Sequence, residues 1–390
     1  MKGALPIGIY SKTTLPSSNF ASLIDEIDKI HEDAEHPMND LIGKTYQYML
    51  NAFAIKTADE KGEFYTPDNI VDLITTLIEP YKGKVYDPCC GSGGMFVQSS
   101  KFIKAHNGKI GTISVYGQEA NADTWKMAKM NMAIRGIDAN LGAYQADTFT
   151  SDWHKTLKAD FILANPPFNY HPWNQEKLID DSRWKYGLPP AGNANYAWIQ
   201  HMIHHLAPNG KIGLVLANGA LSTQTSGEGE IRRKIIEDDL IEGIVAMPTQ
   251  LFYSVTIPVT LWFITKNKKQ KGKTLFIDAR NMGHMVDRKH RDLDDEKDIK
   301  LLADTFEAFQ NGTLEEKKGF SAVATTEEIA KQDYILTPGR YVGIAEQEDD
   351  GEPFEEKMTR LTSELSDMFK KSHELEEEIK KKLGAIGYEM

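Results

Sequence analysis

Cysteine is nearly absent from this sequence, and long apolar runs are missing. The two cysteines, Cys89 and Cys90, are adjacent, so the chain has no framework of disulfide bonds. No apolar run approaches the roughly 20 residues that cross a bilayer. The first residues, MKGALPIGIYSKTT, lack the apolar centre and the small-residue cleavage site of a signal peptide. These absences predict a cytoplasmic protein with no membrane partner.

An excess of positive charge is also absent, since the formal net charge is −12 at pH 7 over 390 residues. A protein that binds DNA alone usually has a basic surface, since neutralising phosphates supplies most of the affinity. If this chain acts on nucleic acid, the basic surface must therefore be local or belong to a partner. The remaining composition, 41% hydrophobic and 26% charged, is ordinary for a globular protein.

The sequence divides into four predicted segments. Residues 1–60 form a short helical N-terminal segment, residues 61–280 alternate strands with helices, residues 281–345 are an irregular extension, and residues 346–390 form a C-terminal helix. The alternation predicts an α/β fold whose sheet is parallel or mixed and is covered on both faces. Ligands bind such sheets beyond the carboxyl ends of the strands, where the unusual residues of this sequence fall.

The C-terminal helix carries a heptad pattern of apolar residues. Its seam alternates steps of three and four over about three heptads, with Ser372 in one slot and apolar side chains at Met358, Leu361, Leu365, Met368, Leu375 and Ile379. This pattern favours a helix that pairs with a partner helix. The alternative is a terminal helix that packs on its own domain.

A glycine-rich stretch, DPCCGSGGM at residues 87–95, follows an apolar segment and precedes a helix. Glycines at 91, 93 and 94 let the backbone turn sharply and approach a ligand closely. The stretch lacks the spacing of the phosphate-binding loop of NTPases and the G-x-G-x-x-G spacing of dinucleotide sites. ATP hydrolysis is therefore not predicted.

Two acidic residues follow at later positions. Glu119 is placed at the end of the second strand and can accept hydrogen bonds from both hydroxyls of a ribose. Asp147 is placed at the end of the third strand, where it can accept from the amino group of an adenine ring. Either residue alone is more often a carboxylate without a ligand, but in this order they describe an adenosine pocket.

The fourth strand ends in the motif NPPF at residues 165–168. Asn165 can present its amide oxygen to a pocket, and the carbonyl of Pro166 can point the same way. Because each proline fixes its own φ and restricts the residue before it, Pro166 and Pro167 hold the chain rigid. Phe168 offers a flat face on which a base can stack, worth about 1–3 kcal/mol. The alternative is a strand ended by prolines with a core phenylalanine.

Together these motifs resemble those of S-adenosylmethionine-dependent amino-methyltransferases of the adenine N6 class, a Rossmann-like class I fold. GEFYTP at 62–67, the lead-in DLIGKTYQYMLNAFA, the later TPGRYVG and the helical C-terminus are similar to the modification (M) subunits of type I restriction-modification systems. The resemblance covers essentially the whole chain from about residue 38. Family members usually carry a longer helical domain ahead of GEFYTP, so the short N-terminal segment is expected to be a truncated domain or a short variant.

The resemblance implies a role for each motif residue. S-adenosyl-L-methionine would be held at its methionine end by Glu63, Phe64, Tyr65, Thr66 and Pro67. The turn that approaches its amino group and ribose would consist of Asp87, Pro88, Gly91, Ser92, Gly93 and Gly94. Glu119 would bind the ribose and Asp147 the adenine, and no metal is implied. The catalytic residues would be Asn165, Pro166, Pro167 and Phe168, and the residues that stack on a flipped-out adenine would be Phe168, Phe252 and Tyr253. The alternative for Phe252 and Tyr253 is that both pack in the core.

The resemblance also implies partners. These are DNA, a specificity (S) subunit docked on the C-terminal helix, a second M subunit, and a restriction (R) subunit. The segment between residue 280 and the terminal helix leaves little room for a domain that reads a DNA sequence, which agrees with a separate S subunit.

Other functions remain open at this point. The motif NPP also occurs in methyltransferases that act on protein glutamine, although those usually read NPPY and are shorter. A non-catalytic assembly subunit is a further alternative. Cys89 follows a proline, as the nucleophile of cytosine C5 methyltransferases does, but it lies in the cofactor turn and is expected to be a packing residue. His201 and His205 are spaced as i and i+4 without the glutamate of an H-E-x-x-H zinc motif.

Overall fold

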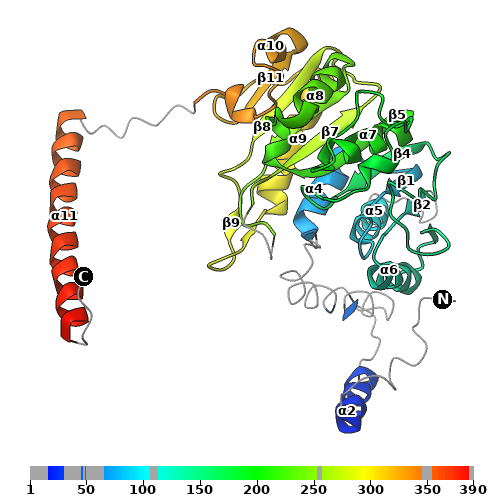
Figure 1. Cartoon of the computed structure of the whole chain (residues 1–390), viewed down its shortest axis with the longest axis horizontal. Coiled ribbons are helices and arrows are strands. Elements are labelled where there is room, and N and C mark those ends of the chain that lie inside the picture. Colours follow the sequence, from blue (N-terminus) through cyan, green and yellow to red (C-terminus); the bar gives the residue numbers. More distant parts are fainter. Residues whose placement is uncertain are drawn as a thin grey trace. The chain divides into compact units, whose positions relative to one another are not determined.

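The computed structural model describes residues 16–29, 45–46, 49, 66–105, 113–252, 257–344 and 354–385. It separates into two compact units, Met1–Ile344 and Ala345–Met390. The first unit is built on a sheet of nine strands (Figure 1). Of the described helices, none combines the length and the apolar content that crossing a bilayer requires.

The strands of this sheet run in the order β11-β8-β6-β7-β5-β4-β1-β2-β3. Their bounds are β1 Gly83–Asp87, β2 Ile113–Gly117, β3 Ala139–Asn140, β4 Ala159–Ala164, β5 Leu206–Ala217, β6 Ile241–Ala246, β7 Val259–Thr265, β8 Lys273–Asp278 and β11 Ser321–Thr325. A separate hairpin pairs β9 His284–Met285 with β10 Arg291–Asp292. β7 is antiparallel to both of its neighbours, so the sheet is mixed, as the alternating pattern predicts.

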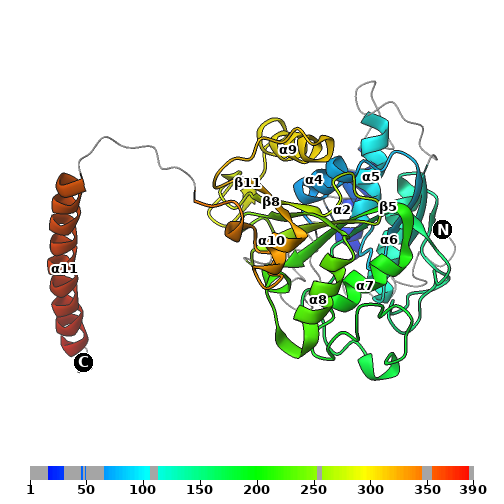
Figure 2. The ribbon, with the colours of Figure 1, turned by 90° about the horizontal axis from the view of Figure 1, so that it is seen from above.

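Helices cover both faces of the sheet (Figure 2). The α-helices among the described residues of the first unit are α2 Ser17–Asp28, α4 Asp68–Ile78, α5 Gly94–Ala105, α6 Ala122–Ile134, α7 Asn195–His205, α8 Glu228–Glu237, α9 Lys300–Asn311 and α10 Thr326–Ala330. The side chains of α4, α5, α6 and α9 share one hydrophobic core, and those of α7, α8 and α10 share the other.

Alternation along the strands explains the two cores. In β5 the side chains of Leu214 and Leu216 enter one core, whereas Val215 enters the other, because successive side chains of a strand point to opposite faces. Gly213 lets α4 approach the strand closely, since a Cβ at this position would lie 2.4 Å from the Ile74 side chain. Residues 212–217 of the strand are therefore buried on both faces, which fits their continuous apolar sequence.

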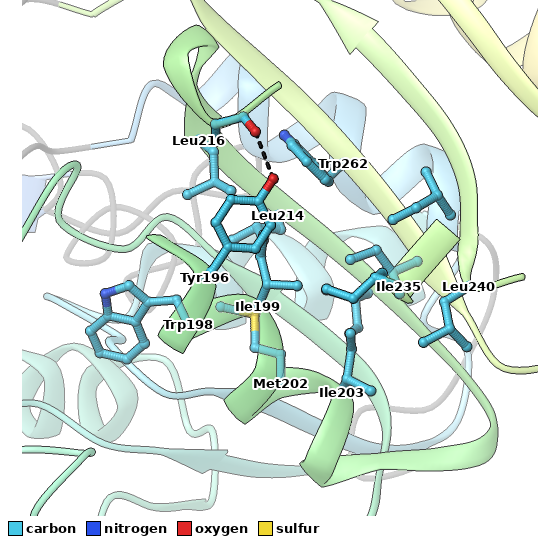
Figure 3. Close-up of a cluster of buried hydrophobic side chains, with 14 of the residues drawn as sticks. Tyr196, Trp198, Ile199, Met202, Ile203, Leu214, Leu216, Ile235, Leu240 and Trp262 are labelled. Carbon is cyan, nitrogen blue, oxygen red and sulfur yellow. Dashed lines mark hydrogen bonds between the residues drawn. The ribbon is translucent and has the colours of Figure 1, made fainter. Parts of the chain in front are cut away.

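Helix α7 is the most deeply buried helix on its face. Figure 3 shows Tyr196, Ile199, Met202 and Ile203 of this helix packed with Leu214 of β5 and with side chains from the neighbouring elements. The Tyr196 hydroxyl donates to the carbonyl of Ala220 at 2.7 Å, so its polar end is satisfied inside the core. Burial on all sides also places four polar side chains of α7 in the interior, namely Asn195, Gln200, His201 and His205.

Local signals set the helix boundaries that matter for the site. Asn121 caps α6 by accepting from the backbone N–H groups of Asp123 at 2.9 Å and Thr124 at 3.1 Å. Pro67 immediately precedes α4, where its missing N–H costs no helical hydrogen bond. Both boundaries place the start of a helix at the carboxyl edge of the sheet.

The sequence expectations differ from the structure at several elements. Asp147 was expected to end the third strand, but β3 ends at Asn140 and Asp147 lies in the following loop. Residues 281–345, expected to be an irregular extension, contain α9 and supply β11 to the main sheet. Within the segment 1–60, which was expected to be helical, α2 is a helix, and most of the remaining residues lie outside the described ones.

The C-terminal unit contains α11, Phe354–Ala385. Its apolar seam residues are exposed in this structure, with Met368 64% and Leu365 50% accessible. Charged pairs such as Arg360–Glu364, at 3.1 Å, lie at i,i+4 spacing along the helix. The helix therefore has the two kinds of surface that an amphipathic partner helix presents.

Candidate active site

The carboxyl ends of β1, β2 and β4 meet at one edge of the sheet. β2 pairs with one side of β1 and β4 with the other, and both pairs are parallel. The strand order therefore reverses at β1, and such a switch point opens a crevice where α/β proteins bind ligands. Asp87 ends β1, Glu119 follows β2 by two residues, and Asn165 follows β4 directly.

The glycine turn after β1 is tied to the segment after β2 by backbone hydrogen bonds. The N–H of Cys90 donates to the carbonyl of Gln118 at 2.9 Å, and the N–H of Gln118 donates to the carbonyl of Asp87 at 3.1 Å. Gly91 adopts φ +53°, which a residue without a Cβ adopts easily, and a Cβ built there would meet no atom within 4 Å. The turn therefore has a fixed backbone and an open side on which a ligand can lie close.

Glu119 braces this turn. One of its carboxylate oxygens accepts from the N–H of Gly91 at 3.0 Å and the other from the N–H of Asn121 at 2.7 Å. Its backbone carbonyl accepts from Ala146 at 2.9 Å, which brings the loop of Asp147 to the same place. The sequence predicted Glu119 and the glycine turn as parts of one pocket, and the structure brings them into contact.

Asp87 is buried at the floor of the crevice, with 2% of its surface accessible. Burial raises the pKa of its carboxyl to about 7, and the nearby charge of Glu119 adds to the shift, whereas the hydrogen bond from the Cys89 N–H opposes it. A raised carboxyl pKa means that this group costs folding stability increasingly as pH rises toward 7. A cationic ligand group beside Asp87 would remove that cost by stabilising the ionised form.

Asp147 holds its own loop in place. Its Oδ1 accepts from the backbone N–H groups of Phe149 at 2.8 Å and Thr150 at 3.0 Å. The hydroxyl of Thr148 donates to the carbonyl of Pro88 at 2.5 Å, which links the loop to the glycine turn. Asp147 thus lies beside the glycine turn although no strand ends at it.

Asn165 lies at the edge next to β1, and its side chain is only half satisfied. Its Nδ2 donates to the hydroxyl of Thr66 at 2.9 Å. Its Oδ1 is buried and has no hydrogen-bond partner among the residues that the structure describes. Because a buried acceptor without a partner costs about 1–3 kcal/mol, it indicates a place where a ligand supplies the donor.

The aromatic residues of the expected base site are only partly described. The rings of Phe168 and Phe252 have centroids 6.3 Å apart and meet edge to face at 81°. Phe252 is 3% exposed and belongs to the core on the α4 side of the sheet. Tyr253 lies outside the described residues, as do Glu63, Phe64 and Tyr65. The stacking role of Phe252 stays a prediction.

The residues that hold the end of the NPPF segment in place were not predicted from the sequence. Asn169 adopts φ +53°, and its side chain and backbone exchange two hydrogen bonds with the amide of Asn195, both at 3.0 Å. The N–H of Ala194 donates to the carbonyl of Tyr170 at 3.1 Å. The start of α7 therefore holds the loop that follows the motif. A contact between residues 26 positions apart leaves no pattern in the sequence. The two asparagines of NANY are the one sequence feature that pointed to the contact between Asn195 and Asn169.

The histidines of α7 belong to a buried network of hydrogen bonds. Asp152, His201 and His205 lie close enough together to hold a metal ion. However, His205 already contacts Asp152 and the carbonyl of Leu157, both at 3.0 Å, and His201 contacts the Tyr86 hydroxyl at 3.0 Å and Arg183 at 3.1 Å. Every ring nitrogen thus has a partner, which favours a structural role for both histidines.

Comparisons with known proteins identify the family of this chain. The family model of the N-6 DNA methylases matches residues 37–350. The HindI methylase subunit of a type I restriction enzyme from Haemophilus influenzae is 56% identical over 351 residues, which are 90% of this chain and 79% of that protein. This chain belongs to the N6 DNA methylases, among the methylase subunits of type I restriction enzymes.

Solved structures support the same family and fold. The methyltransferase subunit of a type I restriction-modification system from Streptococcus thermophilus has a TM-score of 0.73 at 28% identity, covering 83% of this chain and 68% of that one. A class I S-adenosylmethionine-dependent methyltransferase fold from Listeria monocytogenes has a TM-score of 0.54 at 17% identity, with 78% of this chain and 88% of that one covered. The predicted class I methyltransferase fold is confirmed.

Proposed function

We propose that Asn165 and the carbonyl of Pro166 orient the N6 amine of an adenine flipped out of DNA for methylation by S-adenosyl-L-methionine. N6-adenine DNA methylation, as the modification subunit of a type I restriction-modification system, is the activity that family membership gives this chain. The observation that carries the proposed roles is the buried, unpartnered Oδ1 of Asn165 at the switch point of the sheet.

The amine of adenine is a poor nucleophile because its lone pair is delocalised into the ring. A target inside a duplex is also out of reach, so the base must first leave the stack at a cost of a few kcal/mol. Asn165 Oδ1 and the Pro166 carbonyl would each accept one N–H of the amine, which draws the nitrogen toward tetrahedral geometry. Most of the rate gain would come from positioning and from acceptors that are already oriented.

The residues at the edge of β1 and β2 fit S-adenosyl-L-methionine. Asp87 would bind its amino group, Glu119 the ribose and Asp147 the adenine, while the glycine turn has an open side at Gly91. When bound, the cofactor supplies an electrophilic methyl group on a sulfonium. Thr66 contacts Asn165, so the segment that the resemblance places at the methionine end of the cofactor meets the catalytic amide.

The proposed partners are an S subunit, a second M subunit and, in the complete system, an R subunit. The support for the first is the exposed apolar seam of α11, which matches a partner helix. The net charge of −12 also favours a complex in which another subunit supplies much of the DNA-binding surface. Deleting residues 352–390 should abolish co-purification with the S subunit, and retained binding would contradict this docking site. The proposal places the complex in the cytoplasm.

The test of the proposed function measures methyl incorporation into DNA by the full chain together with its S subunit. The Asn165→Ala variant should lose methyl transfer by about a hundredfold or more, because one oriented polar group in an active site is worth about that much. The affinity of the variant for S-adenosylhomocysteine should stay within about twofold of the wild type, which shows an intact cofactor site. An unaltered rate in the variant would overturn the mechanism, and labelling of protein alone would favour glutamine methylation.

A further inference from the structure

The loop of residues 147–151 carries Asp147, and a buried arginine from a distant segment holds it. Arg183 belongs to the long connection between β4 and α7 and is 7% exposed. Its Nη1 donates to the carbonyl of Thr148 at 3.1 Å and its Nη2 to the carbonyl of Phe149 at 2.5 Å. These two carbonyls directly follow Asp147 in the chain, so the guanidinium fixes the backbone on which the Asp147 side chain is carried.

The guanidinium itself is fixed on its other sides. Asp181 accepts from Nε at 2.9 Å and from Nη2 at 2.7 Å, and the Nδ1 of His201 lies 3.1 Å from Nη1. All five N–H groups of Arg183 therefore have acceptors, and the planar fork leaves little freedom of orientation. A lysine, with one point-like ammonium, cannot reach this set of acceptors.

His201 acts as an acceptor toward Arg183, which requires a neutral ring. Burial lowers the pKa of His201 well below its usual value, and the neighbouring His205 and Arg183 add to the shift. With Nδ1 accepting from Arg183, the proton lies on Nε2 and is donated to the Tyr86 hydroxyl at 3.0 Å. Because Tyr86 precedes Asp87 in β1, the network joins the Asp147 loop to the strand beneath the cofactor turn.

We propose that Arg183 is a positioning residue, which sets Asp147 at the distance and angle required to recognise the adenine ring of the cofactor. It acts through the carbonyls of Thr148 and Phe149 and touches no ligand. The proposal rests on the proposed role of Asp147 as the acceptor of the adenine amino group. By this proposal the connection 170–194, which follows the NPPF motif, contributes to the selectivity for the adenine ring of the cofactor.

The test measures, by calorimetry on the full chain, the binding of S-adenosylhomocysteine and of its inosine analogue, in which an oxo group replaces the amino group. The ratio of the two affinities reports the contact at Asp147 and is insensitive to a general loss of stability. Arg183→Lys should reduce this ratio by about tenfold, the equivalent of one hydrogen bond to a charged group. The main loss should fall on the adenosine compound.

Arg232 offers a matched control. It is also a buried arginine, 1% exposed, and it donates to the carbonyls of Tyr334 at 2.7 Å and Thr223 at 2.6 Å, away from the cofactor turn. Arg232→Lys should leave the ratio unchanged. An equal fall of the ratio in both variants would overturn the proposal, because it would show a general effect of replacing a buried arginine.

Two further variants separate the possible failures. Asp147→Asn should itself greatly reduce the ratio of the two affinities. If Asp147→Asn reduces the ratio and Arg183→Lys leaves it unchanged, the proposal fails and the role of Asp147 stands. If neither variant changes the ratio, the role of Asp147 fails and the proposal fails with it. Asp181→Asn, which removes one charged partner of Arg183, should lower the ratio by a smaller factor. If Arg183→Lys does not fold, an unchanged ratio in Asp181→Asn overturns the proposal.

Discussion

The proposed active site has two halves, one for the cofactor and one for the target base, and their polar groups are held in opposite ways. In the cofactor half, Glu119 and Asp147 are carboxylates that already accept hydrogen bonds from backbone N–H groups. In the target half, the central group is the neutral amide of Asn165, whose oxygen has no partner among the described residues. The carboxylates of the cofactor half are thus held in position without a ligand, whereas in the target half the Oδ1 of Asn165 remains available to accept a hydrogen bond from a ligand.

The difference follows from what each half has to recognise. A cofactor with an ammonium group and ribose hydroxyls presents several donors, which carboxylates accept strongly. A neutral adenine amine has two N–H groups to donate and a lone pair that must stay free for the reaction, and an acceptor that bonds only to the N–H groups leaves that lone pair free. Substitutions in the first half should therefore act on cofactor affinity, and those in the second half on the rate of methyl transfer.

The largest effect on cofactor affinity is expected at Asp87. Asp87→Asn keeps the shape of the side chain and the acceptor for the Cys89 N–H, but it removes the charge that would pair with the cofactor amino group. We expect the affinity for S-adenosylhomocysteine to fall by about ten- to a hundredfold, the value of a charge-assisted hydrogen bond. Calorimetric titration of the full chain measures it.

The pH dependence of the same titration provides the control. Because the pKa of Asp87 is raised to about 7, the wild-type affinity should fall by about tenfold per pH unit below that value as the carboxyl takes up a proton. Asp87→Asn should show no such slope. A wild-type affinity that stays constant from neutral to acid pH would contradict the assignment of Asp87.

The second effect is expected in the target half, at Thr66. Thr66→Val has the same shape as the wild type but removes the hydroxyl that accepts from Asn165 Nδ2. The amide then loses the contact that orients it, so we expect the turnover number to fall by about tenfold. Cofactor affinity should change much less. Thr66→Ser retains the hydroxyl and should restore most of the rate; an equal loss in Thr66→Ser, despite its hydroxyl, would show that the packing of the whole side chain, and not the hydrogen bond alone, sets the rate.

The sequence was sufficient to predict the alternating fold and the order of the motifs along it. Helix α4, strand β4 and the turn at Gly91 carry strong local signals, namely apolar periodicity, a short run of mostly apolar residues and glycine spacing. β11 was not predicted because its five residues, SAVAT, carry no clear alternation and depend on pairing with β8. Asp147 lies beside the glycine turn, but a loop and not the end of a strand carries it, which differs from the prediction.

The supporting residues of the site could not be predicted in the same way. Arg183 and the loop after Asp147 are 35 residues apart, and their contact exists only because α7 and the strand-end loops meet in the folded sheet. A buried arginine has no sequence signature that separates it from a surface arginine. Motif reasoning therefore finds the groups that face a ligand, and the structure is needed to find those that hold them.

The smallest effect tests this supporting layer in the target half. Asn195→Ala removes both side-chain hydrogen bonds to Asn169, which follows Phe168 in the chain and holds a left-handed conformation. A left-handed residue without its local support relaxes at a cost of about 1 kcal/mol, so the NPPF segment should loosen and the turnover number should fall about three- to fivefold. The affinity for S-adenosylhomocysteine should not change, since Asn195 has no contact with the cofactor half. Asn169→Gly, which tolerates the same backbone conformation but lacks the amide, should lose a similar factor. If either variant reduced cofactor affinity more than the turnover number, α7 would couple the two halves. The assignment of affinity to one half and of rate to the other would then be wrong.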